Sequence, residues 1–91
     1  MTTEPFRVEI SRPAVRALGR LKPKLVEAVL RFLGGALTEN PTRVTKTLGA
    51  ELEGLRAGHV GIAYRVLVRV DEDARVVQVM RIAHRADVYR P

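Results

Sequence analysis

Residues 62–83, IAYRVLVRVDEDARVVQVMRIA, decide the fold class of this chain because they predict two neighbouring strands. Two runs rich in valine, Ile62–Val70 and Arg75–Ala83, flank a polar, acidic turn. Branched aliphatic residues favour strands, and a short polar connection between two such runs is typical of an antiparallel hairpin. If the turn has a two-residue loop, Asp71 pairs with Ala74 and the register of the whole hairpin follows.

This register predicts one aliphatic face and one face that carries arginines. Tyr64 would pair with Arg81 on the aliphatic face, which should pack against helices. Arg65 and His84 would then lie near each other on the opposite, open face. A slip of one residue would exchange the two faces of the second strand, because side chains alternate along a strand.

The residues before the hairpin predict a strand followed by a pair of helices. Phe6–Ile10 alternates apolar and polar side chains, as a half-buried strand does. Ser11 is a candidate N-cap for the next helix, and Pro13 stands where a first helical turn tolerates proline. A second helix begins at Pro23, and its wide apolar surface predicts burial on most sides.

Residues 34–57 connect the second helix to the hairpin. Gly34-Gly35 indicates either a close backbone contact or an early helix end, and Asn40-Pro41 is the predicted stop. Residues 42–50 are predicted as a basic loop and Leu52–Ala57 as a further strand. The chain is therefore predicted to form one α+β domain over residues 1–91, in the order strand–helix–helix–three strands. The helical hairpin would pack on one face of a mainly antiparallel sheet.

Charge and composition narrow the class of partner. The 91 residues carry a net charge of +6, which favours polyanions such as nucleic acid, the ribosome or an acidic protein. Cysteine is absent, which excludes disulfides and thiolate metal ligands and fits a reducing cytoplasm. No apolar run is long enough to span a membrane, and no secretory leader is expected at the N-terminus.

The C-terminal stretch Arg81–Pro91 is the candidate functional segment. It gathers arginines with His84 and Tyr89, a mixture that folding stability alone does not require. Together with Arg65 on the same predicted sheet face, these groups can bind phosphate and transfer protons. Two structural alternatives stay open: His84 can be a histidine hydrogen-bonded at the strand end, and Tyr89 can be a hydrophobic anchor for the tail.

The chain lacks the common motifs of metal and nucleotide chemistry. It has no P-loop, no GxGxxG, no HExxH and no pair of histidines at metal-ligand spacing, so neither a metal nor a cofactor is expected. Cations, an imidazole and a phenol suit RNA cleavage in which the 2′-hydroxyl of the substrate attacks the phosphate. Such a reaction needs a base for that hydroxyl, cations for the extra charge, and an acid for the leaving oxygen.

Segments spread along nearly the whole chain match the pattern of one known family. They are Leu21-Lys22-Pro23, Asn40-Pro41 with Arg43, Lys46, Leu52-Glu53-Gly54-Leu55, Tyr64-Arg65-Val66-Leu67 and, most specifically, Ala83-His84-Arg85-Ala86-Asp87-Val88-Tyr89-Arg90. This ordered set resembles the RelE/ParE toxins of bacterial type II toxin–antitoxin pairs, and among them the RelE-like branch. The resemblance implies the RelE-like fold.

The resemblance also implies a bacterial cytoplasmic toxin that enters the ribosomal A site and cuts translated mRNA, as an endoribonuclease that uses no metal. A cognate antitoxin would inhibit it, and operator DNA would be bound only by the toxin–antitoxin complex. By motif matching, the catalytic candidates are Arg65, His84, Arg85 and Tyr89. The candidate contacts to mRNA or the ribosome are Arg43, Lys46, Arg56, His59, Arg69 and Arg90. Taken alone, Arg69 is better explained as a solvated residue of an open sheet face.

One segment departs from the family pattern. Relatives carry two or more basic residues just before the segment that matches Tyr64-Arg65, whereas Gly58–Ala63 has only His59. Removing one charge-stabilising group typically lowers a catalytic rate by about 10²–10³. The departure predicts a weakened enzyme, or one that relies on His59 and Arg56 instead. Two alternatives stay open: a gyrase inhibitor of the ParE kind, which shares the fold, and a weakened toxin that acts mainly through antitoxin binding and autoregulation, which this departure favours.

Overall fold

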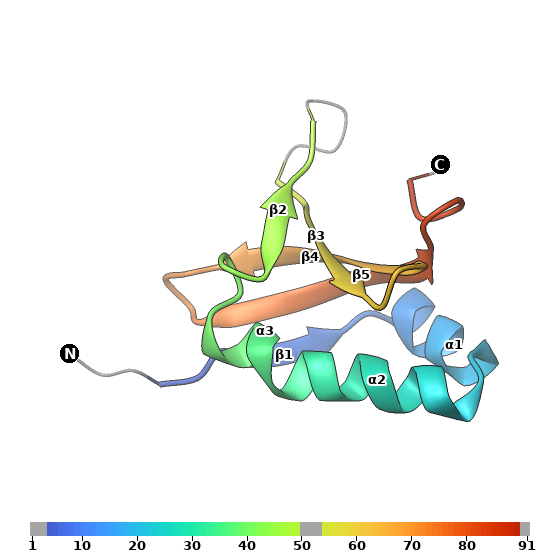
Figure 1. The fold of residues 1–91 in the computed structure, drawn as a ribbon. Coiled ribbons are helices and arrows are strands. Elements are labelled where there is room, and N and C mark those ends of the chain that lie inside the picture. The colour runs from blue at the N-terminus through green and yellow to red at the C-terminus, as the bar shows by residue number, and fades with distance from the viewer. Residues whose placement is uncertain (1–3, 50–53, 90–91) are drawn as a thin grey trace.

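The computed structural model describes residues 4–49 and 54–89, which form a five-stranded sheet with helices on one face (Figure 1). The strand order is β1-β5-β4-β3-β2. β1 runs parallel to β5, and the other neighbouring strands are antiparallel. The strands are β1 (Arg7–Ile10), β2 (Thr45–Thr47), β3 (Arg56–Val60), β4 (Tyr64–Asp71) and β5 (Val76–His84).

The helices form a hairpin, as the sequence predicts. α1 (Arg12–Arg20) and α2 (Pro23–Gly34) lie on the lower side of the sheet in Figure 1, and the short α3 (Ala36–Glu39) follows. The Ser11 hydroxyl accepts a hydrogen bond from the Ala14 backbone N–H, which is the predicted N-cap. The α+β class is therefore confirmed. No helix within the described residues is long and apolar enough to cross a membrane.

The second helix ends earlier than the stop predicted at Asn40-Pro41. Gly35 has φ −115° and ψ −102°, which lie outside the helical region, so α2 ends at Gly34. A Cβ atom at Gly35 would lie 2.9 Å from the carbonyl oxygen of Arg31, so a side chain there would clash with the preceding turn. Of the two possibilities raised by the glycine pair, the early helix end is the one observed.

The main core lies between the helices and the sheet. Its fully buried side chains come from both layers and include Val29, Leu37, Val66, Val68 and Val79. Burial of one such side chain contributes roughly 1.5–3 kcal/mol relative to leaving it in water. The aliphatic face of the predicted hairpin is therefore the face that the helices cover.

Gly58 on β3 is a point of close approach between α2 and the sheet. A Cβ atom at Gly58 would lie 2.6 Å from Cζ of Phe32 and 3.4 Å from a methyl group of Thr45. The missing side chain therefore lets the aromatic ring rest on the strand backbone. This contact fixes how far α2 stands from β2 and β3.

The hairpin between β4 and β5 has a longer loop than the predicted two residues. Asp71 pairs with Val76 rather than with Ala74, and its carboxylate accepts a hydrogen bond from the Ala74 N–H at 3.0 Å. Arg75 closes the loop with a positive φ of 57°. Because the pairing moves by two residues, side-chain alternation is preserved and the aliphatic faces of both strands still coincide.

A β-bulge then changes the faces beyond the middle of β5. The register shifts between Leu67 and Val68, so that Val68 pairs with Val79 but Leu67 pairs with Arg81, and Met80 is the extra residue. A bulge leaves ladder groups without strand partners. Here Ser11 supplies one partner, because its hydroxyl donates to the Met80 carbonyl at 3.0 Å. The residues of β5 after the bulge therefore lie on the faces opposite to those predicted.

The edge of the sheet also differs from the prediction. The predicted basic loop 42–50 contains the edge strand β2, whose sequence Thr-Lys-Thr lacks apolar alternation. The strand predicted over Leu52–Ala57 is observed as β3, which begins at Arg56 and reaches Val60. Residues 50–53 lie outside the described part of the chain. The sheet therefore has one more strand than predicted.

Candidate active site on the open face of the sheet

The face of the sheet that the helices leave uncovered carries the candidate site, and we call it the open face. His59 on β3 pairs with Arg65 on β4, so the two side chains lie on the same face. Lys46 on β2 pairs with Ala57, which is two positions from His59 on the same strand. Alternation therefore places Lys46, His59 and Arg65 together on the open face, each from a different strand.

Arg65 is held by the turn that precedes its own strand. Its Nη1 group donates hydrogen bonds of 2.9 Å to the carbonyl oxygens of Ile62 and Tyr64. Gly61 in that turn has a φ of 63°, a conformation that glycine adopts without strain. A guanidinium group has five N–H donors, so the other nitrogen atoms of Arg65 can still donate to an anion. The turn thus orients one fixed cation on the open face.

The C-terminal tail folds back over the open face (Figure 1). The Arg85 N–H donates to the Ala63 carbonyl at 2.7 Å, which brings the Arg85 backbone beside β4. Val88 is fully buried and packs with Ala57 and Leu67, which form a second apolar cluster on this face. Tyr89 follows directly and is 44% exposed. The tail therefore brings Arg85 and Tyr89 to the face that carries Arg65.

Arg81 also lies on the open face, which corrects its predicted place on the aliphatic face. It pairs with Leu67 because of the bulge. Its Nη1 group donates to the Val88 carbonyl at 2.9 Å, and so it helps to hold the tail in position. The regular register predicted from the sequence would keep this arginine away from the site, and only the bulge brings it there.

His84 lies on the opposite face from Arg65, contrary to the predicted register. It pairs with Tyr64, and the two rings meet edge to face with centroids 5.6 Å apart. Its Nδ1 atom accepts a hydrogen bond from the Ala86 N–H at 3.1 Å. The structure therefore favours the structural alternative for His84, a histidine hydrogen-bonded at the strand end.

Arg56 holds a loop and does not join the open-face group. Its Nε donates to the Thr45 hydroxyl at 2.7 Å, and its Nη2 donates to the Thr42 and Thr45 carbonyls, both at 2.9 Å. Arg56 pairs with Val68, a residue of the main core, which places it on the helix side. Its guanidinium is therefore engaged in fixing the segment that leads into β2.

The other predicted contacts are spread over the edges of the molecule. Arg43 is exposed in the loop before β2, and Arg69 is exposed on β4, where it pairs with Gln78. Arg90 lies outside the described residues. Of the predicted RNA-contacting set, the structure brings Lys46 and His59 to Arg65, while Arg43 lies farther along the edge of the sheet.

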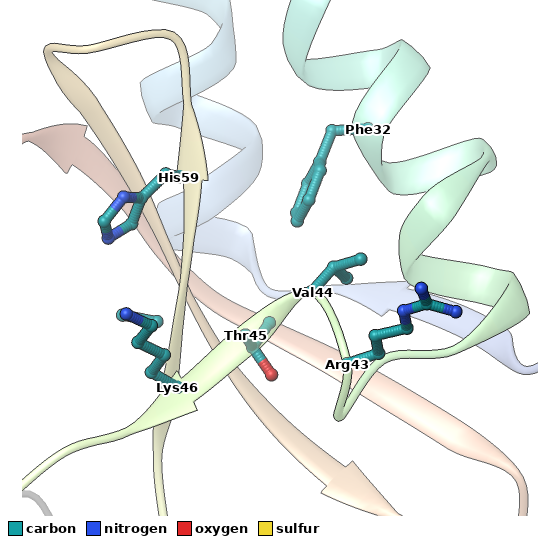
Figure 2. A pocket seen from close by; sticks show the side chains of 7 residues that line it. Phe32, Arg43, Val44, Thr45, Lys46 and His59 are labelled. Carbon is teal, nitrogen blue, oxygen red and sulfur yellow. The ribbon is translucent and has the colours of Figure 1, made fainter.

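A pocket of about 300 Å³ opens between β2, β3 and α2 (Figure 2). Figure 2 shows Lys46 and His59 on one side and Arg43 on the other, with Phe32 and Val44 between them. The remaining lining residues are Thr45 and Ala57. The pocket thus joins an apolar floor to a basic rim, and His59 belongs both to its rim and to the open face.

The environment of His59 changes its acid–base behaviour. Desolvation, followed by the positive charges of Arg65 and Lys46, lowers the pKa of His59 from its ordinary value of 6.5. The side chain is nevertheless exposed to solvent. At neutral pH its imidazole is therefore uncharged and can accept a proton.

Metal-ligand groups are not gathered at this site. Within residues 4–49 and 54–89, no cluster of three or more histidine, cysteine, aspartate or glutamate side chains can hold a metal ion. The chemistry that the arrangement itself supplies is that of guanidinium, ammonium, imidazole and phenol groups. These groups bind phosphate and move protons.

The fold is that of a toxin of a type II toxin–antitoxin system. A family model described as "ParE toxin of type II toxin-antitoxin system, parDE" matches residues 8–89, so the chain belongs to the RelE/ParE toxin family. Toxin RelG of Mycobacterium tuberculosis is 40% identical over 86 residues, which cover 94% of this chain and 98% of the relative. Toxin RelE of the same organism is 38% identical over 86 residues, covering 94% of this chain and 88% of the relative.

The solved structure of the toxin–antitoxin complex RelBE2 from Mycobacterium tuberculosis contains a similar chain. Its TM-score against this chain is 0.86 at 37% sequence identity, and the match covers 94% of this chain and 98% of that one. The family predicted from the ordered motifs and the RelE-like fold are therefore both confirmed.

Proposed function

We propose that this toxin is a ribosome-dependent endoribonuclease that cuts translated mRNA in the ribosomal A site. The observation that carries the proposal is the arrangement around Ala63. Arg65 lies two residues beyond Ala63 on β4, and the Arg85 backbone is bonded to the Ala63 carbonyl at 2.7 Å. With Lys46 and His59 on the same face, a phosphodiester would meet cations from β2, β4 and the tail, beside the uncharged imidazole of His59 on β3.

The proposed reaction uses the substrate's own 2′-hydroxyl as the nucleophile. A bond forms between the 2′-oxygen and phosphorus while the bond from phosphorus to the 5′-oxygen breaks. Arg65 and Arg85 would stabilise the extra negative charge on the phosphorane, because guanidinium groups donate paired hydrogen bonds to phosphate oxygens. The Tyr89 phenol would protonate the leaving 5′-oxygen. The products are a 2′,3′-cyclic phosphate and a 5′-hydroxyl.

The ribosome would supply the substrate in the required geometry. A net charge of +6 draws a small domain to ribosomal RNA and mRNA, and the A site presents mRNA as an unpaired strand. Recognition of RNA rather than DNA follows from the chemistry, since DNA has no 2′-hydroxyl to attack.

A cognate antitoxin is the proposed inhibitor, in the cytoplasm, with operator DNA bound only by the complex of the two proteins. The solved relative from Mycobacterium tuberculosis is itself a toxin–antitoxin complex. This chain offers an apolar groove between α1 and α2, lined among others by Leu18, Leu21, Val26 and Leu30. Leu30 is 50% exposed there, and an amphipathic antitoxin helix can bury such a surface.

Induction of the toxin in a bacterial host tests the proposal. Growth should stop, and the transcripts should carry new 5′ ends inside translated codons. Arg65→Ala should abolish both effects. Arg16→Ala on α1 is the matched control, because it removes the same charge from an exposed helix on the other side of the molecule. Growth arrest with uncut transcripts would contradict the proposal.

A gyrase inhibitor of the ParE kind is the second candidate. It is favoured by the matching family model, which carries the ParE description. Such a binding inhibitor has no need for Arg65 and Arg85 at neighbouring positions. Induction would then raise DNA-damage signalling while transcripts stay intact, and Arg65→Ala would keep its toxicity. A toxin weakened in catalysis would instead leave growth unaffected and still bind its antitoxin.

A further inference from the structure

The two histidines of the chain occupy different environments. His84 accepts a hydrogen bond through Nδ1 and packs against Tyr64, so its imidazole already has a structural task. Within the described residues, the His59 imidazole makes no hydrogen bond, and it stands exposed on the open face. His59 is therefore the histidine that can act on a bound molecule.

His59 lies between Arg65 and the pocket, two places at which a bound RNA strand can be held. On one side it pairs across the β3–β4 ladder with Arg65, the cation fixed by the Ile62 and Tyr64 carbonyls. On the other side it forms part of the rim of the pocket between β2, β3 and α2 (Figure 2). A nucleotide seated in the pocket would thus place the phosphate that follows it near Arg65.

The pocket suits a ribonucleotide better than a purely apolar ligand. Phe32, Val44 and Ala57 give it an apolar floor, on which a nucleobase can pack. Arg43 and Lys46 give it a basic rim, on which phosphate can bind. Its volume of about 300 Å³ is at the lower end of the usual range for small-molecule sites, which accords with one nucleotide rather than several.

Within residues 4–49 and 54–89, the charged groups identified around His59 and its pocket are cations. Arg65 belongs to β4, Lys46 to β2 and Arg43 to the loop before β2, while α2 contributes the uncharged Phe32 to the pocket. Among the described residues, no carboxylate lines this pocket. The imidazole is therefore held neutral at pH values where an isolated histidine is already partly protonated.

From this arrangement we infer that His59 accepts the proton of the attacking 2′-hydroxyl, and that the pocket beside it holds the ribonucleotide carrying this hydroxyl. The inference rests on the proposed ribonuclease function and assigns its base. The 2′-hydroxyl proton passes to a ring nitrogen of His59 as the 2′-oxygen bonds to phosphorus. The 5′-oxygen leaves with a proton from Tyr89, so one proton is taken up and one is released by the protein.

The pH dependence of cleavage tests the assignment. With wild-type toxin on mRNA-programmed ribosomes, kcat/KM should fall in acid below pH 6.5, because only the neutral imidazole accepts a proton. His59→Gln should lower kcat by about 10²–10⁴, the usual contribution of a general base, and should lose this acid limb. Lys46→Ala should move the limb towards higher pH, because a positive neighbour of His59 is removed.

Chemical rescue separates a base from a residue that only shapes the site. Added imidazole should restore part of the activity of His59→Ala, whereas it should leave Arg65→Ala inactive. Val44→Phe tests the pocket, since a larger side chain on its floor should raise KM with little change in kcat. Circular dichroism and thermal melting of each variant should be unchanged, which would show that the fold is retained.

The outcomes distinguish the two proposals. If the wild type cuts mRNA and His59→Gln cuts within about threefold of it with the same acid limb, His59 is not the base and the ribonuclease function stands. If Val44→Phe leaves KM unchanged, the nucleotide does not occupy the pocket. If the wild type leaves mRNA intact while it arrests growth, the ribonuclease function fails, and the assignment of His59 fails with it.

Discussion

His59 and Arg65 face each other across the β3–β4 ladder on the open side of the sheet. Arg65 is oriented by two backbone carbonyls, while the imidazole of His59 remains exposed beside a pocket. One residue is thus a fixed cation and the other a neutral proton acceptor. Together the two residues can bind an anion and accept a proton, which neither residue can do alone.

Arg65→Ala is expected to lower the rate of mRNA cleavage by about 10²–10³, the usual cost of one charge-stabilising group. The fold should remain, because the side chain is only half-buried and bonds to a turn. Arg65→Lys should recover little activity, because an ammonium group lacks the planar donors of guanidinium. Quantitative primer extension on ribosome-bound mRNA measures the rates. Full activity of Arg65→Ala would show that Arg65 does not take part in cleavage.

Val88→Ala is expected to reduce cleavage without unfolding the domain. Val88 is the buried anchor of the tail, so its loss should release Arg85 and Tyr89 from their positions. Arg81→Ala should act in the same direction, because Arg81 donates to the Val88 carbonyl. Val15→Ala, on α1 and 53% exposed, is the control. Hydrogen exchange should rise in the tail alone; faster exchange throughout the sheet would show that Val88 stabilises the whole fold.

Gly58→Ala is expected to destabilise the domain by about 1–3 kcal/mol, the range observed when a packed site is overfilled. The new methyl group would lie 2.6 Å from the Phe32 ring and would push α2 from the sheet. Gly19→Ala is the matched control, since a Cβ there has no neighbour within 4 Å and α1 should gain from alanine. Urea unfolding measures both free energies. Equal stability of Gly58→Ala and wild type would refute the close contact.

Acid should destabilise the fold through His59. Its pKa is lower in the folded protein than the ordinary 6.5, so below pH 6.5 the unfolded chain binds the proton more readily. The free energy of unfolding should therefore decrease as the pH falls from 6.5 to the folded pKa, and should level off below it. His59→Gln should lack this component. A difference between the two proteins that does not change with pH would contradict the lowered pKa.

The sequence predicts the helical hairpin and the β4–β5 hairpin because their patterns are local. Ser11 and Pro13 mark the first helix, and the alternating valines mark the strands. The turn is longer than predicted, and the Asp71 carboxylate accepts a hydrogen bond within the loop. A polar stretch of this kind can form turns of several lengths, so the sequence alone does not decide between them. The difference in loop length leaves the faces of β4 and β5 as predicted up to the bulge, because it moves the pairing by two residues.

The bulge is the feature that sequence patterns could not reveal. Met80 sits in a stretch, residues 76–83, that has no glycine or proline to mark a bulge, and the partner of its carbonyl, Ser11, is 69 residues away along the chain. One extra residue there exchanges the faces of Arg81 and His84. The sequence likewise does not place His59 beside Arg65. The strand that carries His59 is predicted to end at Ala57, and the sequence assigns no pairing between that strand and β4.

The most direct measurement of the central claim is cleavage in a purified system. Ribosomes carrying a defined mRNA with an empty A site are mixed with wild-type toxin or with Arg65→Ala, and the mRNA ends are mapped and chemically typed. The account predicts cuts within the A-site codon that leave a 2′,3′-cyclic phosphate and a 5′-hydroxyl, at a rate reduced by about 10²–10³ in the variant. Intact mRNA with the wild-type protein, under conditions in which that protein arrests growth, would contradict it.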